Sequence, residues 1–293
     1  LNVNRIIKSD WVIIQNSPLL LSFSSIILFK YIFKKKIALN VSDLWPLSAL
    51  ELGVIKRGKF YNFLETIETF NYQNSDLILG QSNEILNHVE QKVKKPNMLY
   101  RNLPLEQTTN LKKLNNNKNF KIVYAGLLGV AQGIYDIIKN LDFKKLNIEF
   151  DIYGEGNELS KITDYLVANP NCNINYKGCL TKTELMNILP IYNASLVPLK
   201  TYIKGAVPSK IFELVSLSIP ILYMGDGEAA NLIKKWGVGY VCNAQDFFSL
   251  EKNIIKISKF NSDYKSLCRN CKKITKNELD FKSQINNLIK KLI

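Results

Sequence analysis

The residue types best suited to binding a phosphorylated ligand gather in one short segment in the second half of the chain. Residues 205–214 read GAVPSKIFEL, and Ser209 is predicted to be the N-cap of a helix that begins near Lys210. Lys210 and Glu213 would then lie in the first turn of that helix. A lysine in this position can neutralise phosphate charge, and a carboxylate can accept both hydroxyl groups of a ribose. The segment suits a nucleoside diphosphate, although a solvated helix start with ordinary capping charges would contain the same residue types.

Glycines follow four of the predicted strands of the second half. In chain order, the loops contain Gly126 and Gly129, then Gly154 and Gly156, then Gly178, then Gly225 and Gly227. Glycine allows backbone N–H groups to approach a ligand closely, and such groups at the start of a helix favour phosphate. A tight turn would explain any one of these glycines. Their concentration at strand ends favours a nucleotide site.

Such loops must be held by a parallel sheet, and the second half of the chain predicts one. Short apolar runs alternate with helical patterns, and the predicted strands are residues 122–125, 148–153, 174–176, 195–198, 221–223 and 240–242. We expect them to form a doubly wound α/β domain over residues 121–275. In such sheets the ligand binds beyond the carboxyl ends of the strands, where the glycine loops lie.

The first half predicts a similar domain over residues 1–105. Continuous apolar runs at residues 11–16 and 37–41 flank a helical stretch, and they are typical of fully buried parallel strands. A helix is expected over residues 61–72, with further strands at residues 77–79 and 98–100. The polar residues 106–120 are predicted to be a linker. Residues 276–293 are predicted to form a helix that crosses back to the first domain.

Residues 18–33, PLLLSFSSIILFKYIF, are the stretch that most resembles a membrane segment, and three lysines follow them. The stretch is interrupted by polar residues and is shorter than the ~20 residues that span a bilayer. Its lysines follow the apolar run, whereas those of a signal peptide precede it. Two interpretations stay open: a helix packed on the sheet, or shallow docking on an anionic membrane.

The composition is that of a globular protein with anionic partners. The chain has 293 residues, of which 46% are hydrophobic and 22% charged, and its formal net charge is +14. The positive charge is mostly scattered lysine without a nucleic-acid-reading motif, so no nucleic-acid partner is predicted. Five cysteines favour a reducing compartment. Cys268 and Cys271 are interpreted as incidental, and no metal site is predicted, since the single histidine, His88, is distant and expected at the surface.

The ordered motifs of the whole chain resemble a known family. They are YAGxxG at 124–129, YGxG at 153–156, YxG at 176–178, PSKxxE at 208–213 and PIL at 220–222. This order resembles the C-terminal domain of retaining, GT-B-fold glycosyltransferases of family 4. DLWP at 43–46 with LG at 52–53 resembles the first-domain loop of the polysaccharide branch, which includes colanic-acid, O-antigen and N-acetylfucosaminyl enzymes. The resemblance implies two Rossmann-like domains that face a cleft.

The resemblance also implies roles for individual residues. Glu213 would bind the donor ribose, and Lys210 would stabilise the leaving diphosphate. Asp43 is a candidate polar contact to the donor sugar, with a simple turn residue as the alternative. The remaining implied donor-binding residues are Gly126, Gly129, Gly154, Gly178, Leu180, Ser209, Gly227, Glu228 and Ala229. The resemblance implies no metal and no cofactor beyond the UDP-sugar co-substrate.

Three features depart from the family pattern. The first carboxylate of its Glu-x7-Glu pair is replaced by Gly205. Leu127 and Gln132 stand where many members have the arginine and lysine that hold the diphosphate. The strand and glycine-rich loop that open a complete first domain are not found before residue 11, so we expect an N-terminally truncated first domain.

The function expected from the resemblance is transfer of a sugar from a UDP donor to a lipid-diphosphate-linked glycan in bacterial surface polysaccharide (O-antigen, lipopolysaccharide) synthesis. The sugar is expected to be an N-acetylated amino or deoxyamino sugar, and the place of action the cytoplasm, peripherally at the inner face of the plasma membrane. One alternative is a non-catalytic fragment or accessory subunit that retains the nucleotide lobe. Another is an isomerase like the UDP-N-acetylglucosamine 2-epimerases, which needs several acid–base groups.

Overall fold

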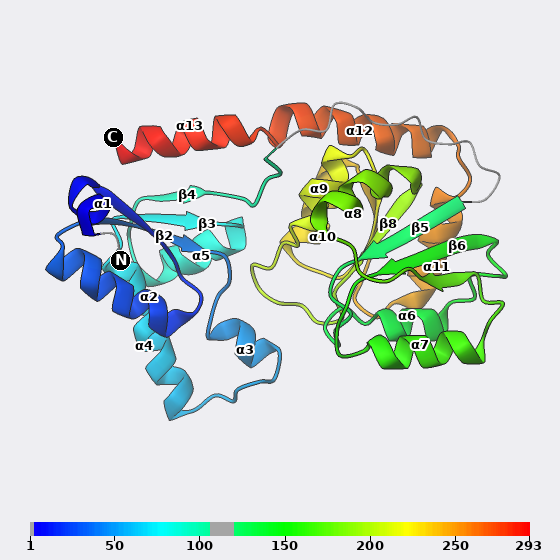
Figure 1. Ribbon diagram of the computed structural model, residues 1–293, viewed down its shortest axis with the longest axis horizontal. Helices are drawn as coiled ribbons and strands as arrows, with labels where there is room; N and C mark the ends of the chain where they lie inside the picture. Colours follow the sequence, from blue (N-terminus) through cyan, green and yellow to red (C-terminus); the bar gives the residue numbers. More distant parts are fainter. Residues whose placement is uncertain (1–2, 106–119) are drawn as a thin grey trace. The chain divides into compact units, whose positions relative to one another are not determined.

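The computed structural model describes residues 3–105 and 120–293 and divides the chain into two compact α/β units (Figure 1). The first unit comprises the chain up to Asn102 together with Ile203–Val207 and Lys282–Ile293. The second comprises Leu103–Tyr202 and Pro208–Phe281. The predicted linker at 106–120 lies outside the described residues except for Phe120, which begins a strand.

The first unit is built on a parallel four-stranded sheet whose order follows the chain. Its strands are β1 (Trp11–Gln15), β2 (Lys36–Val41), β3 (Leu77–Gly80) and β4 (Asn97–Leu99). Its helices are α1 (Val3–Lys8), α2 (Leu19–Ile26), a π-helix (Ile27–Ile32), α3 (Leu47–Glu51), α4 (Lys59–Gln73), α5 (Asn83–Lys92) and α13 (Phe281–Leu292). Because successive side chains point to opposite faces of a strand, the side chains of β2 and β3 pack in two different hydrophobic cores.

Helices cover both faces of this sheet. Ile37 and Ile78 pack in one core with residues of α2, α4 and α5. Ala38 and Leu77 pack on the other face with Leu288 of α13. Leu288 belongs to the C-terminal segment that was expected to form a single helix over 276–293. That expectation was wrong in its bounds, because α12 ends at Glu278 and a new helix begins at Phe281.

The edge strand and the helix after it are less buried than their apolar sequences predict. β1 pairs with β2 alone, and its Ile13 is 57% exposed, so the expectation of a fully buried strand was wrong there. In α2, Leu19 and Ile26 are buried, whereas Leu20 and Leu21 lie mostly in solvent. Within residues 3–105 and 120–293, none of the helices combines the length and apolarity needed to cross a membrane.

The first unit also contains a buried charged cluster that the sequence did not indicate. Glu68 of α4 is 1% exposed. Its carboxylate lies 3.0 Å from His88 Nε2 and 2.7 Å from Lys92 Nζ of α5, and the Tyr72 hydroxyl donates to it at 2.8 Å. Burial alone would raise the pKa of Glu68, but His88 and Lys92 outweigh it and lower that pKa. The expectation that His88 lies at the surface was therefore wrong.

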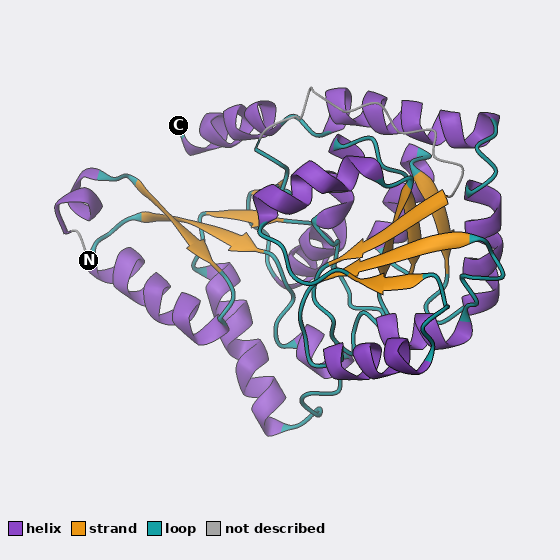
Figure 2. Ribbon diagram, turned by 45° about the vertical axis from the view of Figure 1, so that its right-hand side comes forward, coloured by secondary structure: helices purple, strands orange, loops and turns teal. Residues whose placement is uncertain are grey.

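The second unit is built on a doubly wound parallel sheet (Figure 2). Its six strands lie in the order β10-β9-β8-β5-β6-β7. These are β5 (Phe120–Ala125), β6 (Ile148–Tyr153), β7 (Ile174–Tyr176), β8 (Ala194–Pro198), β9 (Ile221–Met224) and β10 (Gly239–Cys242). The chain runs outward from β5 in one direction and resumes on its other side with β8. Ligands of such sheets bind beside this change of direction, at the carboxyl ends of the strands.

Helices lie on both faces of this sheet as well. They are α6 (Ile134–Asn140), α7 (Leu159–Ala168), α8 (Lys182–Ile188), a 3-10 turn (Leu189–Ile191), α9 (Lys210–Ser216), α10 (Glu228–Trp236), α11 (Phe247–Ile257) and α12 (Ser262–Glu278). Ile137 of α6, Ile162 of α7 and Ile254 of α11 share one core with Ile122 and Phe150 of the sheet. α9 and α10 contact β9, and α9 also contacts β8.

The five cysteines are all free thiols. Cys268 and Cys271 lie on α12, where Cys271 is completely buried. Across the described part of the chain, no group of three or more His, Cys, Asp and Glu side chains is arranged to hold a metal ion.

Candidate functional site

A cavity of about 280 Å³ opens at the carboxyl ends of β5, β6 and β7 in the second unit. Each of the three strands contributes the residues at its end or in the loop that follows it. The lining residues are Ala125, Gly126, Leu127, Tyr153, Gly154, Glu155, Cys179, Leu180 and Leu185. Three of the residues predicted from the sequence to bind the donor, Gly126, Gly154 and Leu180, thus line one cavity.

The loops behind this cavity are joined by backbone hydrogen bonds. The N–H of Gly126 donates to Tyr153 O at 3.0 Å, and that of Gly154 to Gly178 O at 3.0 Å. Gly154 has φ +134°, and a Cβ there would lie 1.8 Å from the carbonyl oxygen of Gly126. Only glycine allows this approach without moving the backbone. These glycines are therefore explained by loop packing, and the two N–H groups are already used within the protein.

Lys210 extends from the start of α9 to the end of β5. A Cβ built on Gly126 would meet Lys210 Nζ at 1.6 Å, so the ammonium group lies directly against this glycine. The same Nζ is 4.8 Å from the centre of the Tyr124 ring. Burial lowers the pKa of Lys210 to about 8, and the nearby Glu213 only partly opposes this effect. The site therefore holds a partly desolvated cation close to the apolar cavity, where an anion would relieve the cost of burial.

Glu213 lies in the first turn of α9, as the sequence predicted, and forms an ion pair. Its Oε1 is 2.9 Å from Nζ of Lys182, at the start of α8. The Glu213 side chain is 22% exposed and that of Lys182 is 77% exposed. The flexible lysine can move away, which leaves the carboxylate accessible to a hydroxyl-bearing ligand.

Ser209 precedes α9 but does not cap it through its side chain. It has helical backbone angles, and no side-chain capping bond is formed. Its carbonyl oxygen instead accepts the N–H of Phe212 at 3.0 Å. Ser209 is thus the N-cap residue by position, and the helix begins at Lys210, as predicted, but the capping hydrogen bond expected of a serine is absent.

The other predicted donor residues of the second unit lie outside the cavity lining. Gly227, Glu228 and Ala229 lie at the end of β9, where α10 begins. Glu228 and Ala229 are buried, and Gly227 has φ +83°. Gly129 lies in the loop after β5, packed against Gln132. Their donor-binding roles stay predictions.

Ala125, Leu127 and Tyr153 line the cavity beside the predicted glycines without having been assigned a role themselves. Four further residues of the site were not predicted from the sequence. Glu155, Cys179 and Leu185 line the cavity, and Lys182 pairs with Glu213. Each lies within nine residues of a strand end. Their position close to the strand ends was therefore the sequence feature that could have identified them. Their residue types alone did not indicate a role in the site.

In the first unit, Asp43 follows β2 and accepts a hydrogen bond from Ser48 Oγ at 3.1 Å. This contact fits the turn interpretation, and a contact to sugar stays a prediction. Gly205 also belongs to this unit. Its N–H donates to Glu84 Oε2 at 2.7 Å. With φ +81°, it would place a Cβ 2.6 Å from Ile85 Cγ1, so a glutamate in place of Gly205 would not fit this packing.

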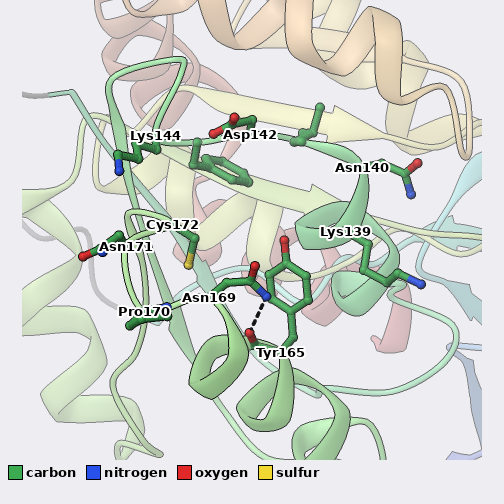
Figure 3. Close-up of a pocket in the computed structure, with 11 residues that line it drawn as sticks. Lys139, Asn140, Asp142, Lys144, Tyr165, Asn169, Pro170, Asn171 and Cys172 are labelled. Carbon is green, nitrogen blue, oxygen red and sulfur yellow. Dashed lines mark hydrogen bonds between the residues drawn. The ribbon is translucent and has the colours of Figure 1, made fainter.

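A larger hollow of about 430 Å³ lies elsewhere in the second unit (Figure 3). It is lined by residues 139–144, which precede β6, and by Tyr165 and residues 169–172, which precede β7. It therefore lies at the amino ends of these strands. Parallel α/β sheets bind their ligands at the opposite edge, so the smaller cavity is the candidate for the functional site.

No protein-family model and no curated protein sequence matches this chain. Solved structures match it in fold. Anabaena HepE, in complex with UDP, has a TM-score of 0.76 at 13% identity over 99% of this chain and 80% of its own. The pneumococcal O-GlcNAc transferase GtfA, in complex with UDP and GlcNAc, has a TM-score of 0.67 at 15% identity over 99% of this chain.

TarM has a TM-score of 0.71 at 12% identity over 96% of this chain. The chain has the GT-B fold. The α/β, GT-B fold class predicted from the motifs is thus confirmed. This chain spans 54% of TarM and 59% of GtfA.

Proposed function

We propose that this chain is a glycosyltransferase that binds a UDP-sugar in its second unit. The observation that carries the proposal is the partly desolvated ammonium group of Lys210, held against Gly126 beside the cavity at the carboxyl ends of β5–β7. A diphosphate is the ligand class that such a cation suits best. The GT-B fold supports the proposal, as do the UDP complexes of HepE and GtfA.

In this proposal each predicted residue has a distinct part. The base enters the apolar cavity beside Gly154 and Leu180, and the carboxylate of Glu213 accepts the ribose hydroxyl groups. The bond between the anomeric carbon and the diphosphate breaks, and an acceptor hydroxyl forms the new bond with retention of configuration. The proton of that hydroxyl passes to the departing diphosphate. Lys210 neutralises charge on the departing UDP, which is electrostatic stabilisation of the transition state. No metal is needed for this step.

The acceptor in this proposal is a lipid-diphosphate-linked glycan, and the sugar is an N-acetylated amino sugar. Asp43 of the first unit is the candidate polar contact to the donor sugar. Such an acceptor lies at the inner face of the plasma membrane. The exposed Leu20 and Leu21 of α2, Ile32 of the π-helix and the basic residues 34–36 form a surface suited to shallow contact with anionic lipid.

Release of UDP from a panel of UDP-sugars tests the proposal, measured with lipid-linked acceptors from bacterial membranes. We expect acceptor-dependent release by the wild type, and a loss of at least about tenfold in Glu213→Ala. UDP binding without any release would instead favour the accessory-subunit alternative. Sedimentation with anionic vesicles tests the membrane surface: Leu20→Ser/Leu21→Ser should bind less, whereas Val167→Ser, exposed on α7, should match the wild type.

A further inference from the structure

The cavity carries a single charged side chain that the proposed function has not used. Of the nine residues that line it, Glu155 is the only one with a formal charge. Leu127, Leu180 and Leu185 provide apolar walls, which suit the faces of a flat ring. A lone carboxylate among apolar walls is well placed to determine which edge of such a ring is accepted.

The position of Glu155 is fixed by its backbone. Its carbonyl oxygen accepts the N–H of Leu128 at 2.7 Å, which joins it to the loop after β5. Gly156, the next residue, would place a Cβ 2.3 Å from the carbonyl oxygen of Leu128. The chain on the C-terminal side of Glu155 is thus packed tightly against the β5 loop. A selecting group needs such a fixed support.

The carboxylate also has a thiol neighbour. Desolvation and, after it, the neighbouring Glu155 carboxylate raise the pKa of Cys179. The thiol therefore stays protonated at neutral pH and does not compete with Glu155 as an anion. Glu155 remains an acceptor with further lone pairs available, because an ionised carboxylate offers about four acceptor positions.

We propose that Glu155 selects the nucleobase of the donor by accepting a hydrogen bond from a ring N–H. Uracil carries such a group at N3 and guanine at N1, whereas cytosine presents a lone pair at its N3. The carboxylate would attract the first two bases. In cytosine it would meet the N3 lone pair and could accept a hydrogen bond only from the amino group on the neighbouring carbon. This inference rests on the proposed function, since it concerns the same nucleotide, and it adds the residue that distinguishes UDP from CDP.

The test is a calorimetric titration of the full chain with UDP, CDP, GDP and UDP methylated at N3. A hydrogen bond to a charged group predicts that the wild type binds UDP about tenfold to hundredfold more tightly than CDP or the methylated UDP. Glu155→Gln should bring this ratio to within about threefold, because an amide can also donate to cytosine N3. Asp164→Asn, which removes an exposed carboxylate on α7, should leave the ratio unchanged.

Each outcome bears on the inference. Tighter binding of GDP than UDP, with discrimination against CDP lost in Glu155→Gln, supports the same recognition with guanine as the natural base. UDP binding with an unchanged UDP-to-CDP ratio in Glu155→Gln overturns the inference and leaves the proposed function standing. Failure of all these nucleotides to bind the folded wild type overturns both.

Discussion

Replacing Lys210 by methionine is expected to stabilise the second unit while weakening nucleotide binding. Burial lowers the pKa of Lys210 from the ordinary 10.5 to about 8. At about 1.4 kcal/mol per pH unit, the protonated lysine then costs roughly 3 kcal/mol of folding free energy at pH 7. The variant also loses the favourable contact of Lys210 with the Tyr124 ring, which lowers its free energy of unfolding by about 1 kcal/mol. We therefore expect the free energy of unfolding to rise by about 2 kcal/mol in Lys210→Met.

The pH dependence separates this cause from ordinary repacking. Between pH 8 and 10.5 the unfolded chain holds the proton of Lys210 and the folded protein has lost it. The stability of the wild type relative to Lys210→Met therefore rises with pH across this window. The free energy of unfolding by which Lys210→Met exceeds the wild type should decrease by about 1.4 kcal/mol per pH unit above pH 8. Other titrating groups are common to both proteins and cancel in the difference.

Urea unfolding followed by the fluorescence of Trp236 measures this difference. Trp236 lies in the second unit and packs against Phe212 of α9, with ring centroids 6.2 Å apart. Replacing the two tryptophans of the first unit by phenylalanine isolates its signal. Lys182→Met is the matched control, because that lysine is 77% exposed and should change stability by less than about 0.5 kcal/mol. If the difference in free energy of unfolding between the wild type and Lys210→Met stayed constant from pH 7 to 10, burial of a charged Lys210 would be refuted.

Four further substitutions test the glycines and the buried cluster. Gly154→Ala should abolish UDP binding and lower the melting temperature, because its Cβ would lie 1.8 Å from the Gly126 carbonyl oxygen. Gly178→Ala, with φ +83° but no atom within 4 Å, should cost only about 1 kcal/mol, measured by the same thermal melt. Glu68→Gln should destabilise the first unit by about 3 kcal/mol at pH 7. Because the pKa of Glu68 is lowered, this stability should be present above pH 4.5 and lost as the pH falls through the lowered pKa, in urea titrations at each pH. Gly205→Glu should loosen the 203–207 segment, seen as faster amide hydrogen exchange there; unchanged exchange would contradict the packing described.

The strands could be predicted from the sequence because parallel strands with two covered faces are continuous apolar runs. All ten predicted strands are present within two residues of their expected ends. The loops with the glycines follow from the strand ends, so three predicted residues line the cavity. Interpreting a continuous apolar run as a strand covered on both faces overestimated the burial of Ile13. The run does not reveal that its strand lies at the edge of a sheet.

What the sequence could not predict depends on contacts between distant segments. The charged partners of Glu68, His88 and Lys92, come from another helix, so no local pattern indicates the cluster. Glu155 looks like an ordinary loop residue until the cavity is seen. Position 205 holds a glycine in place of the family carboxylate because Ile85, distant in sequence, leaves no space for a side chain there. Ser209 occupies the N-cap position, but its helical backbone angles are not those with which a serine side chain caps a helix.

Binding of UDP by the second unit is the central claim, and one calorimetric titration tests it most directly. UDP is titrated at pH 7 into the wild type, Glu213→Ala and Lys210→Met. Loss of a charge-assisted contact predicts UDP affinity at least about tenfold weaker in both variants than in the wild type. Equal UDP affinity in all three proteins, or no UDP binding by the folded wild type, would contradict the account.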